Sequence, residues 1–537
     1  MRATRRSIPI ITLLILALAA SGASLANGFA YDDVRAISGN PVIHTLAAPW
    51  VYAQQPYWYL LGILYRPLTI WLFAVQWQIG GGAPWVFHLT NVLLILASTL
   101  AVYALAKRLM HRAGAWLVAA LFAVHPVHVE VVGNAVGQSE LLCTLATTLT
   151  VLAYLRVRAT DQAIPWHKGI GIALLAALAA FAKEEAFMIP LLLGAAELIL
   201  VRSERSWRDR IGLLRPVWGG LGLALLLVLL CRSMVLEGAG AGPLHVAFRD
   251  LGVGGRLLTM LTIVPQWARL LLWPAHLQAD YGPPGITGVT TLTAAGVLGL
   301  LLLALFVVAL AATWRRMPAV AFGLAWCAIA LFPVSNFVIP TGVLLAERTL
   351  FMPSVGAMIA VGAVLWWLMG SARESRWVQS AAIAMIGVIL LLGVLRSARR
   401  QQVWRDSATL FAYMSAHEPS ARGPRLYAEY LSEQGDPQAA EVFLRQSAAM
   451  APGNAEVYEA LGQVLRSLGR CDEAVPVLET ALKIEPERAK ARGRLFTCLQ
   501  ELGDTARARQ VAAEGMAQGI TVYRKLLTED GAAKASR

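Results

Sequence analysis

The sequence has 537 residues, of which 57% are hydrophobic and 15% are charged, and its mean hydropathy is +0.58. This composition excludes a soluble globular protein of this length and predicts an integral membrane protein. The net charge of +13 does not indicate a nucleic-acid partner, because the Lys and Arg residues stand between apolar runs, as they do in the cytoplasmic loops of membrane proteins.

Long apolar runs fill the chain as far as about residue 395. A spanning helix needs about 20 mostly apolar residues, and eleven runs approach this length: 8–27, 86–106, 113–133, 140–156, 169–183, 185–201, 211–231, 291–313, 318–335, 350–369 and 378–396. A twelfth stretch, 257–272, is expected to enter the membrane or lie on its surface without crossing. Residues 7–26 could instead be a cleaved signal peptide, since Ser24-Leu25-Ala26 resembles a small-residue cleavage site.

The basic residues between these runs set the orientation. Clusters that fall on one side of the membrane include Lys107-Arg108, Arg156 with Arg158, Arg202 to Arg210, and Arg315-Arg316. By the positive-inside rule this side is cytoplasmic. Eleven crossings then place the remainder of the chain outside, although Arg396, Arg399 and Arg400 oppose this orientation.

Ionisable residues gather on the predicted outer side, where they are functional-site candidates by default. They are Asp32, Asp33, Arg66, His125, His128, Glu130, Glu140, Lys183, Glu184, Glu185, Glu347 and Arg348. An acidic pair just outside the first helix suits a general base for an acceptor hydroxyl. Three cations, Arg66, Lys183 and Arg348, suit a phosphate-bearing leaving group. This pattern predicts glycosyl transfer from a phospholipid.

Simpler interpretations stand beside this one. Asp32 and Asp33 could merely end a helix and turn the chain, and Lys183-Glu184 and Glu347-Arg348 could be local ion pairs. His125, His128 and Glu130 carry groups that suit zinc or manganese, but Pro126 argues against one helical face presenting both imidazoles. We therefore expect hydrogen-bonded histidines, no metal and no other cofactor.

The five cysteines are Cys143, Cys231, Cys327, Cys471 and Cys498. They show no metal-binding spacing, and three of them lie in apolar segments. Neither zinc nor disulfides are expected.

A 34-residue period marks the C-terminal part. Gly435, Gly469 and Gly503 are 34 residues apart, as are Ala440, Ala474 and Ala508. This is the period of tetratricopeptide repeats. Repeats are expected to begin near Ala421, Ala455 and Ala489, after an incomplete leading unit over 404–419. The fold class is thus all-α: a polytopic helix bundle over 1–398, followed by a repeat solenoid over 399–537.

A set of short motifs resembles the transmembrane and tetratricopeptide-repeat O-mannosyltransferases, which belong to the GT-C glycosyltransferase superfamily. The motifs are Tyr31-Asp32-Asp33, Tyr65-Arg66-Pro67, His88-Leu89 with Asn91, His125-Pro126-Val127-His128 with Glu130, Lys183-Glu184, Ser335-Asn336 and Ala346-Glu347-Arg348. The resemblance covers the whole chain and implies inverting, metal-independent transfer of mannose from a polyprenyl-phosphate carrier to Ser or Thr of a protein, with the acidic pair as the catalytic site. Gln138 in place of an arginine and Glu185 in place of a neutral residue depart from the pattern.

We therefore expect a multi-pass glycosyltransferase whose partners are a lipid-linked sugar donor, membrane lipids and an acceptor polypeptide bound by the repeats. The small-residue-rich composition is typical of bacteria, which indicates the inner membrane with periplasmic repeats. One alternative is a non-catalytic, membrane-anchored scaffold for envelope proteins. A lipid-carrier transporter is a third possibility, but it predicts polar residues in both leaflets.

Overall fold

The computed structural model describes residues 4–236, 245–249, 251–371 and 376–517, so residues 518–537 of the expected repeat domain lie outside the described part. The chain divides into two compact units. The membrane unit comprises Met1–Ala279 and Gly288–Asp406, and the repeat unit comprises Asp280–Thr287 and Ser407–Arg537. Within the described residues there is no β-strand beyond two isolated bridges. The all-α fold class is confirmed.

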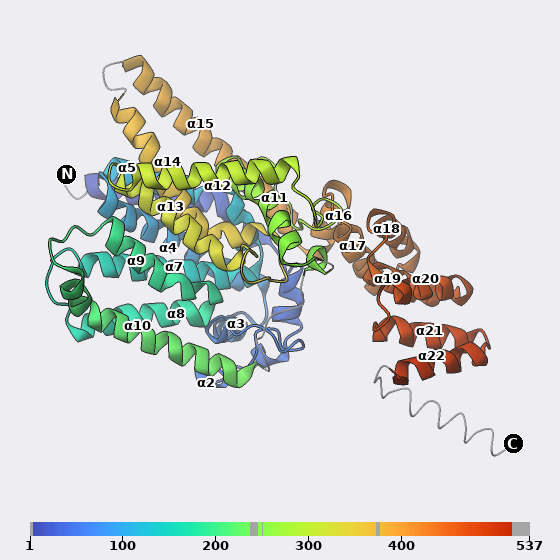
Figure 1. Ribbon diagram of the computed structural model, residues 1–537. Coiled ribbons are helices and arrows are strands. Elements are labelled where there is room, and N and C mark those ends of the chain that lie inside the picture. Colours follow the sequence, from blue (N-terminus) through green and yellow to red (C-terminus); the bar gives the residue numbers. More distant parts are fainter. Residues whose placement is uncertain (1–3, 237–244, 250, 372–375, 518–537) are drawn as a thin grey trace. The chain divides into compact units, whose positions relative to one another are not determined.

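In the part of the chain that the structure describes, the membrane unit contains fifteen α-helices, many of them labelled in Figure 1. They are α1 (Thr4–Ser21), α2 (Pro49–Tyr52), α3 (Pro67–Gly80), α4 (Pro84–Leu109), α5 (Arg112–Ala123), α6 (Val129–Gly133), α7 (Gln138–Val157), α8 (Trp166–Ala182), α9 (Ile189–Ile199), α10 (Trp207–Val235), α11 (Val253–Leu272), α12 (Ala294–Thr313), α13 (Pro318–Leu331), α14 (Phe351–Ser371) and α15 (Arg376–Gln401). Proline at the first helical position of α3, α4 and α13 helps to start these helices, because it needs no amide partner there.

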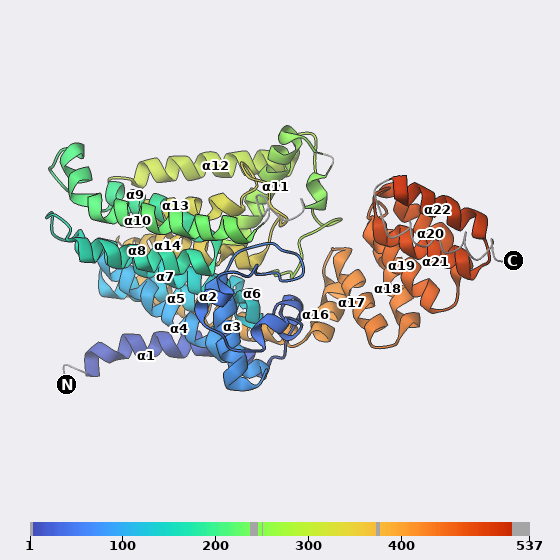
Figure 2. The same cartoon turned by 90° about the horizontal axis from the view of Figure 1, so that it is seen from below.

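The long helices pack as neighbours in a bundle (Figure 2). Helix α4 packs on α5 and α7, α7 packs on α8, and α8 packs on α10, while α14 packs on α5 and α13. Small residues permit close approach of the helices: a Cβ atom on Gly323 of α13 would lie 2.6 Å from the carbonyl oxygen of Gly356 in α14. Such glycine contacts are typical of helix association in lipid, where van der Waals packing replaces the hydrophobic effect.

Seven helical segments are long and apolar enough to cross a membrane, or eight if the bent pair formed by Arg112–Ala123 and Pro126–Gly133 is one span. They are Ile8–Ala26, Pro84–Leu109, Ala135–Val157, Trp207–Val235, Ala294–Thr313, Glu347–Gly370 and Arg376–Trp404. Two shorter apolar helices, Trp166–Ala182 and Pro318–Val334, fall at other predicted spans. The multi-pass architecture is confirmed, whereas the count of eleven spans stays a prediction.

Side-chain contacts between distant segments restrict the topology. Lys183 forms an ion pair with Glu140, and Arg348 forms one with Glu130, so all four residues lie on one side of the membrane. Between Lys183 and Arg348, helices α10 and α12 are long and apolar enough to span, and the sequence predicts that α9 and α13 cross as well. An even number of crossings returns the chain to the side it left. A crossing by α11 would break this parity. The contacts therefore favour an α11 that does not cross on its own, as expected for 257–272.

As far as residue 517, where the described part ends, the repeat unit contains α16 (Ser407–His417) and three helix pairs. The pairs are α17 (Arg422–Glu433) with α18 (Pro437–Met450), α19 (Ala455–Ser467) with α20 (Cys471–Ile484), and α21 (Ala489–Glu501) with α22 (Thr505–Ala517). Gly435, Gly469 and Gly503 all adopt positive φ, between 75° and 85°, which glycine tolerates best. The same turn thus joins the two helices of each pair, and this geometry explains the 34-residue period.

The topology can be tested with reporters fused after Ala421 and, as a matched control, after Arg316. We expect a reporter that is active only outside the cytoplasm to give signal after Ala421 and none after Arg316. Three predicted crossings, by α13, α14 and α15, separate the two sites and place them on opposite sides of the membrane. Enzymatic activity of both reporter types in intact cells is the measurement. Cytoplasmic signal after Ala421 would contradict the proposed orientation.

Candidate active site on the predicted outer face

Asp33 is the buried member of the acidic pair. Its carboxylate is fully shielded from solvent and accepts backbone N–H groups from Ala135 at 3.0 Å, Val136 at 2.8 Å and Ala30 at 3.3 Å. Ala135 and Val136 form the turn that precedes α7, so Asp33 ties the segment after α1 to the start of α7. Burial raises the pKa of Asp33 to about 7, and the three N–H donors limit the rise. Asp33 is therefore engaged in holding the backbone.

Asp32 has a different environment. It is half-buried and makes no hydrogen bond or ion pair with any residue that the structure describes. The preceding residue, Tyr31, has a φ of +55°, in the left-handed region that costs a non-glycine residue roughly 1–2 kcal/mol. A π-helical turn, Val34–Ser38, follows the pair. These bends direct the two adjacent carboxylates differently and leave Asp32 accessible.

Each cation of the cluster pairs with a carboxylate from a distant segment. Arg66, which precedes α3, places its Nη2 atom 3.0 Å from Oε2 of Glu184. The Nζ atom of Lys183 lies 2.9 Å from Glu140 and 2.8 Å from Glu185. Lys183 therefore pairs with two other carboxylates and not with its neighbour Glu184, so the interpretation of these two residues as a local ion pair is wrong.

Arg348 likewise pairs with a carboxylate from a distant segment of the chain. Its guanidinium lies 2.5 Å from Oε1 of Glu130, and its backbone N–H donates to Oε2 of the same residue at 2.8 Å. The neighbouring Glu347 instead accepts the backbone N–H of Gln278 at 2.6 Å. The local pair Glu347-Arg348 is thus also wrong. The turn before α14 is fixed to the turn around α6.

The charged residues form one electrostatic cluster. The charges of Glu130, Asp32 and Glu140 all act on Arg348, and those of Lys183, Arg66 and Arg348 act on Glu140. Burial opposes the charge on Glu184, but Arg66 outweighs it and holds the pKa of Glu184 below its usual value. The structure thus brings together the predicted acidic pair, the three cations and their carboxylates, from segments as far apart as 32 and 348.

His125 and His128 lie beside this cluster as hydrogen-bonded core residues. The Nε2 atom of His125 lies 3.0 Å from the carbonyl oxygen of Leu271, and its Nδ1 accepts the backbone N–H of Val127. The Nε2 atom of His128 lies 2.8 Å from the Ser354 hydroxyl. Within the described ranges, no group of three potential metal ligands includes either histidine. The two imidazoles bind the loop before α6 to α11 and α14.

Other motif residues support the loops that carry the site. The Asn91 side-chain amide donates to the carbonyl oxygens of Val131, Val132 and Asn134, and His88 contacts the carbonyl oxygen of Gly28 at 3.0 Å. Gln138, at the position where the family pattern has an arginine, exchanges two 2.8 Å hydrogen bonds with Gln76. A neutral, buried contact between two side-chain amides thus stands where the family pattern has the charge of an arginine.

Two residues that the sequence did not single out belong to the cluster. The Arg66 guanidinium lies over the Tyr57 ring, 4.9 Å from its centroid, and Arg232 lies 3.8 Å from Glu184. The sequence pattern could have identified Arg232, because this residue directly follows the apolar run 211–231 on the predicted outer side. Tyr57 lies in a polar loop where nothing in the sequence distinguishes it from other aromatic residues.

Comparisons with known proteins match the two parts of the chain separately. Residues 66–231 match the family model described as dolichyl-phosphate-mannose-protein mannosyltransferase, and residues 465–519 match a tetratricopeptide-repeat model. The oligosaccharyltransferase AglB of Archaeoglobus fulgidus, solved with an inhibitory peptide and a dolichol-phosphate, aligns with a TM-score of 0.47 and 15% identity over 79% of this chain and 59% of that chain.

Curated relatives align over most of this chain. Protein O-mannosyl-transferase Tmtc1 of Drosophila melanogaster is 27% identical over 81% of this chain and 60% of its own length. Protein O-mannosyl-transferase TMTC3 of Mus musculus is 25% identical over 89% of this chain and 55% of its own length. The chain thus spans a little over half the length of these relatives. With both family models matched in the expected order, the chain is similar in its membrane part and in its repeats to the transmembrane and tetratricopeptide-repeat protein O-mannosyltransferases.

Proposed function

We propose that the protein is a GT-C glycosyltransferase that moves a sugar, mannose by its family, from a polyprenyl-phosphate carrier to a Ser or Thr hydroxyl of a protein on the outer membrane face. The observation that carries the proposal is the contrast within the acidic pair. Asp33 is occupied by three backbone N–H groups, while Asp32 is accessible and close enough to Arg348 for their charges to interact. A base beside a cation is what this transfer requires.

In the proposed reaction, Asp32 takes the proton of the acceptor hydroxyl, and the hydroxyl oxygen attacks the anomeric carbon of the sugar. The bond from that carbon to the phosphate oxygen breaks, and the phosphate leaves with the electron pair. Attack opposite the leaving group inverts the anomeric centre. Arg348 and Arg66 stabilise the charge that develops on the phosphate, so we propose a transfer that needs no metal.

The three cations differ in their availability to a phosphate. The side chain of Arg348 is 25% exposed, that of Arg66 is 12% exposed and that of Lys183 is 8% exposed. Lys183 already contacts two carboxylates, so a phosphate there has to displace one of them. We therefore propose Arg348 as the main phosphate ligand, with Arg66 second and Lys183 as the residue that positions Glu140 and Glu185. The remaining residues, among them His125, His128 and Glu347, line and support the site.

The acidic pair gives the first test. Asp32→Asn should lower the transfer rate on the order of a hundred- to ten-thousand-fold, because it removes the general base, without loss of protein from the membrane. Asp33→Asn removes part of an acceptor that serves three buried N–H groups, which costs about 1–3 kcal/mol of stability, and should lower the melting temperature more than the rate. Transfer from a labelled polyprenyl-phosphate sugar in purified membranes and thermal unfolding in detergent measure the two effects.

Glu204→Gln serves as the control, because it makes the same change from carboxylate to amide in an exposed loop that the charge pattern assigns to the cytoplasmic side. It should alter neither the transfer rate nor the melting temperature. Near-wild-type transfer by Asp32→Asn and by Asp33→Asn would make the acidic pair structural and would favour the non-catalytic scaffold.

The phosphate ligand can be separated from the ion pair that holds it. Arg348→Gln alone leaves the buried Glu130 charge unpaired, which destabilises the fold. The double variant Arg348→Gln with Glu130→Gln removes both charges and should fold. We expect its apparent affinity for the donor lipid to fall roughly 10- to 100-fold, the loss of one hydrogen bond to a charged group. Donor titration of the folded double variant is the measurement, and unchanged affinity would exclude Arg348 as the phosphate ligand.

The division of labour between the units is tested by deleting residues 407–537. The candidate site residues all precede this segment, so donor-lipid binding should be retained. Transfer to a protein acceptor should fall sharply, while transfer to a short peptide at high concentration persists, if the repeats bind the acceptor polypeptide. Loss of donor binding by a truncated protein that remains folded in the membrane would show that the repeats contribute to the donor site.

A further inference from the structure

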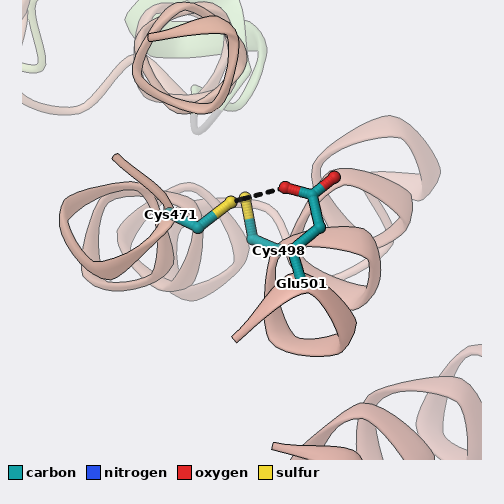
Figure 3. Close-up of side chains that lie close together, drawn as sticks. All are labelled: Cys471, Cys498 and Glu501. Carbon is teal, nitrogen blue, oxygen red and sulfur yellow. Dashed lines mark hydrogen bonds between the residues drawn. The ribbon is translucent and has the colours of Figure 1, made fainter. Parts of the chain in front are cut away.

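The repeat unit contains two of the five cysteines, Cys471 and Cys498, and the structure brings them together. Cys471 opens α20 and Cys498 lies in α21, so the two residues come from successive repeats. Their Sγ atoms point toward each other and are 2.7 Å apart (Figure 3). Both side chains are buried. A spacing of 27 residues gave no indication of this contact, because only the packing of one repeat on the next produces it.

We propose that Cys471 and Cys498 form a disulfide bond in the mature protein. The inference rests on the outer-face location of the repeats in the proposed function, because disulfides persist in oxidising compartments and are rare in the cytosol. The oxidant is a protein or small-molecule disulfide. One cysteine attacks the oxidant's disulfide, forms a mixed disulfide and releases the first thiol of the oxidant. The second cysteine then attacks this mixed disulfide, which completes the protein disulfide and releases the oxidant's second thiol.

The surroundings favour a disulfide over a metal ion. Glu501 lies with the two thiols, its Oε2 atom 3.0 Å from Sγ of Cys471, and the three groups could in principle share an ion. However, Arg466 donates two hydrogen bonds to Oε1 of Glu501, at 3.0 and 2.8 Å, so a guanidinium charge already neutralises the carboxylate. Two thiolates on one tetrahedral zinc ion lie roughly 3.8 Å apart. The two sulfurs are closer together than that.

The burial of the pair indicates when the bond forms. Burial in the folded unit raises the pKa of the Cys471 thiol, and only the thiolate attacks a disulfide. Oxidation therefore takes place during folding, before α20 and α21 close over the sulfurs. The bond then adds a covalent link between the second and third repeats, which are otherwise joined only by packing and by the chain between them.

The test uses the full-length protein in membranes, quenched in acid, denatured and labelled with a maleimide polymer before or after reduction. We expect three labelled thiols without reduction and five after it. Cys471→Ser and Cys498→Ser should each show four in both conditions. The matched control Cys231→Ser removes a membrane-unit thiol and should show two before reduction and four after. Reduction should also lower the melting temperature of the repeat unit by roughly 5–10 °C in the wild type and leave it unchanged in Cys471→Ser.

Five labelled thiols without reduction would overturn the disulfide. Stoichiometric zinc in such a protein, measured by mass spectrometry of the metal, would assign the pair to a metal site instead. The reporter after Ala421 separates the two hypotheses: free thiols with an active outside reporter refute the disulfide alone, whereas free thiols with a cytoplasmic reporter refute the outer location of the proposed function as well.

Discussion

The ion pairs between distant segments are the constraint on which the membrane unit depends. Glu130 is only 1% exposed and Lys183 only 8% exposed at the side chain, and an unpaired charge at such depth is strongly destabilising. Arg66, Lys183 and Arg348 each satisfy this requirement with a carboxylate from another part of the chain. The pairs therefore hold α3 and α7 to the turn before α9, and hold the turn before α14 to α6. In the proposed function, a donor phosphate has to share cations that already stabilise the fold, so the proposal links donor binding to the packing of the bundle.

The acidic pair shows how adjacent, identical side chains acquire different properties. Asp33 faces inward onto the turn before α7, where backbone N–H groups hold its carboxylate. Asp32 follows Tyr31, whose positive φ turns the chain, and remains accessible. The sequence predicts that two neighbouring residues in a turn point in different directions. It does not predict which one is buried, because that depends on Ala135 and Val136, about a hundred residues further along the chain.

The same limit explains which parts of the structure could be predicted. Helical runs and the repeat period are local patterns, so the all-α class and the three helix pairs follow from residues such as Gly435, Gly469 and Gly503. The gathering of charged residues such as Glu130, Lys183 and Arg348 also follows, because the charge alternation assigns all of them to one side of the membrane. The ion-pair partners of these residues cannot be predicted in this way, because Lys183 pairs with Glu140 and Glu185 and not with its neighbour Glu184. The contact between Cys471 and Cys498 and the contact of Tyr57 with Arg66 also depend on tertiary packing, and no local sequence pattern indicates them.

The segment Asp280–Thr287 shows that the repeat unit is more than a C-terminal tail. This segment lies between α11 and α12 in the sequence yet belongs to the repeat unit. The backbone N–H of Asp280 donates to Glu418 at 3.2 Å, and that of Ala421 donates to the carbonyl oxygen of Pro283 at 3.0 Å. The chain consequently passes between the two units three times, after residues 279, 287 and 406. Three covalent connections therefore join the repeat unit to the membrane unit, where a C-terminal domain on a single linker has one.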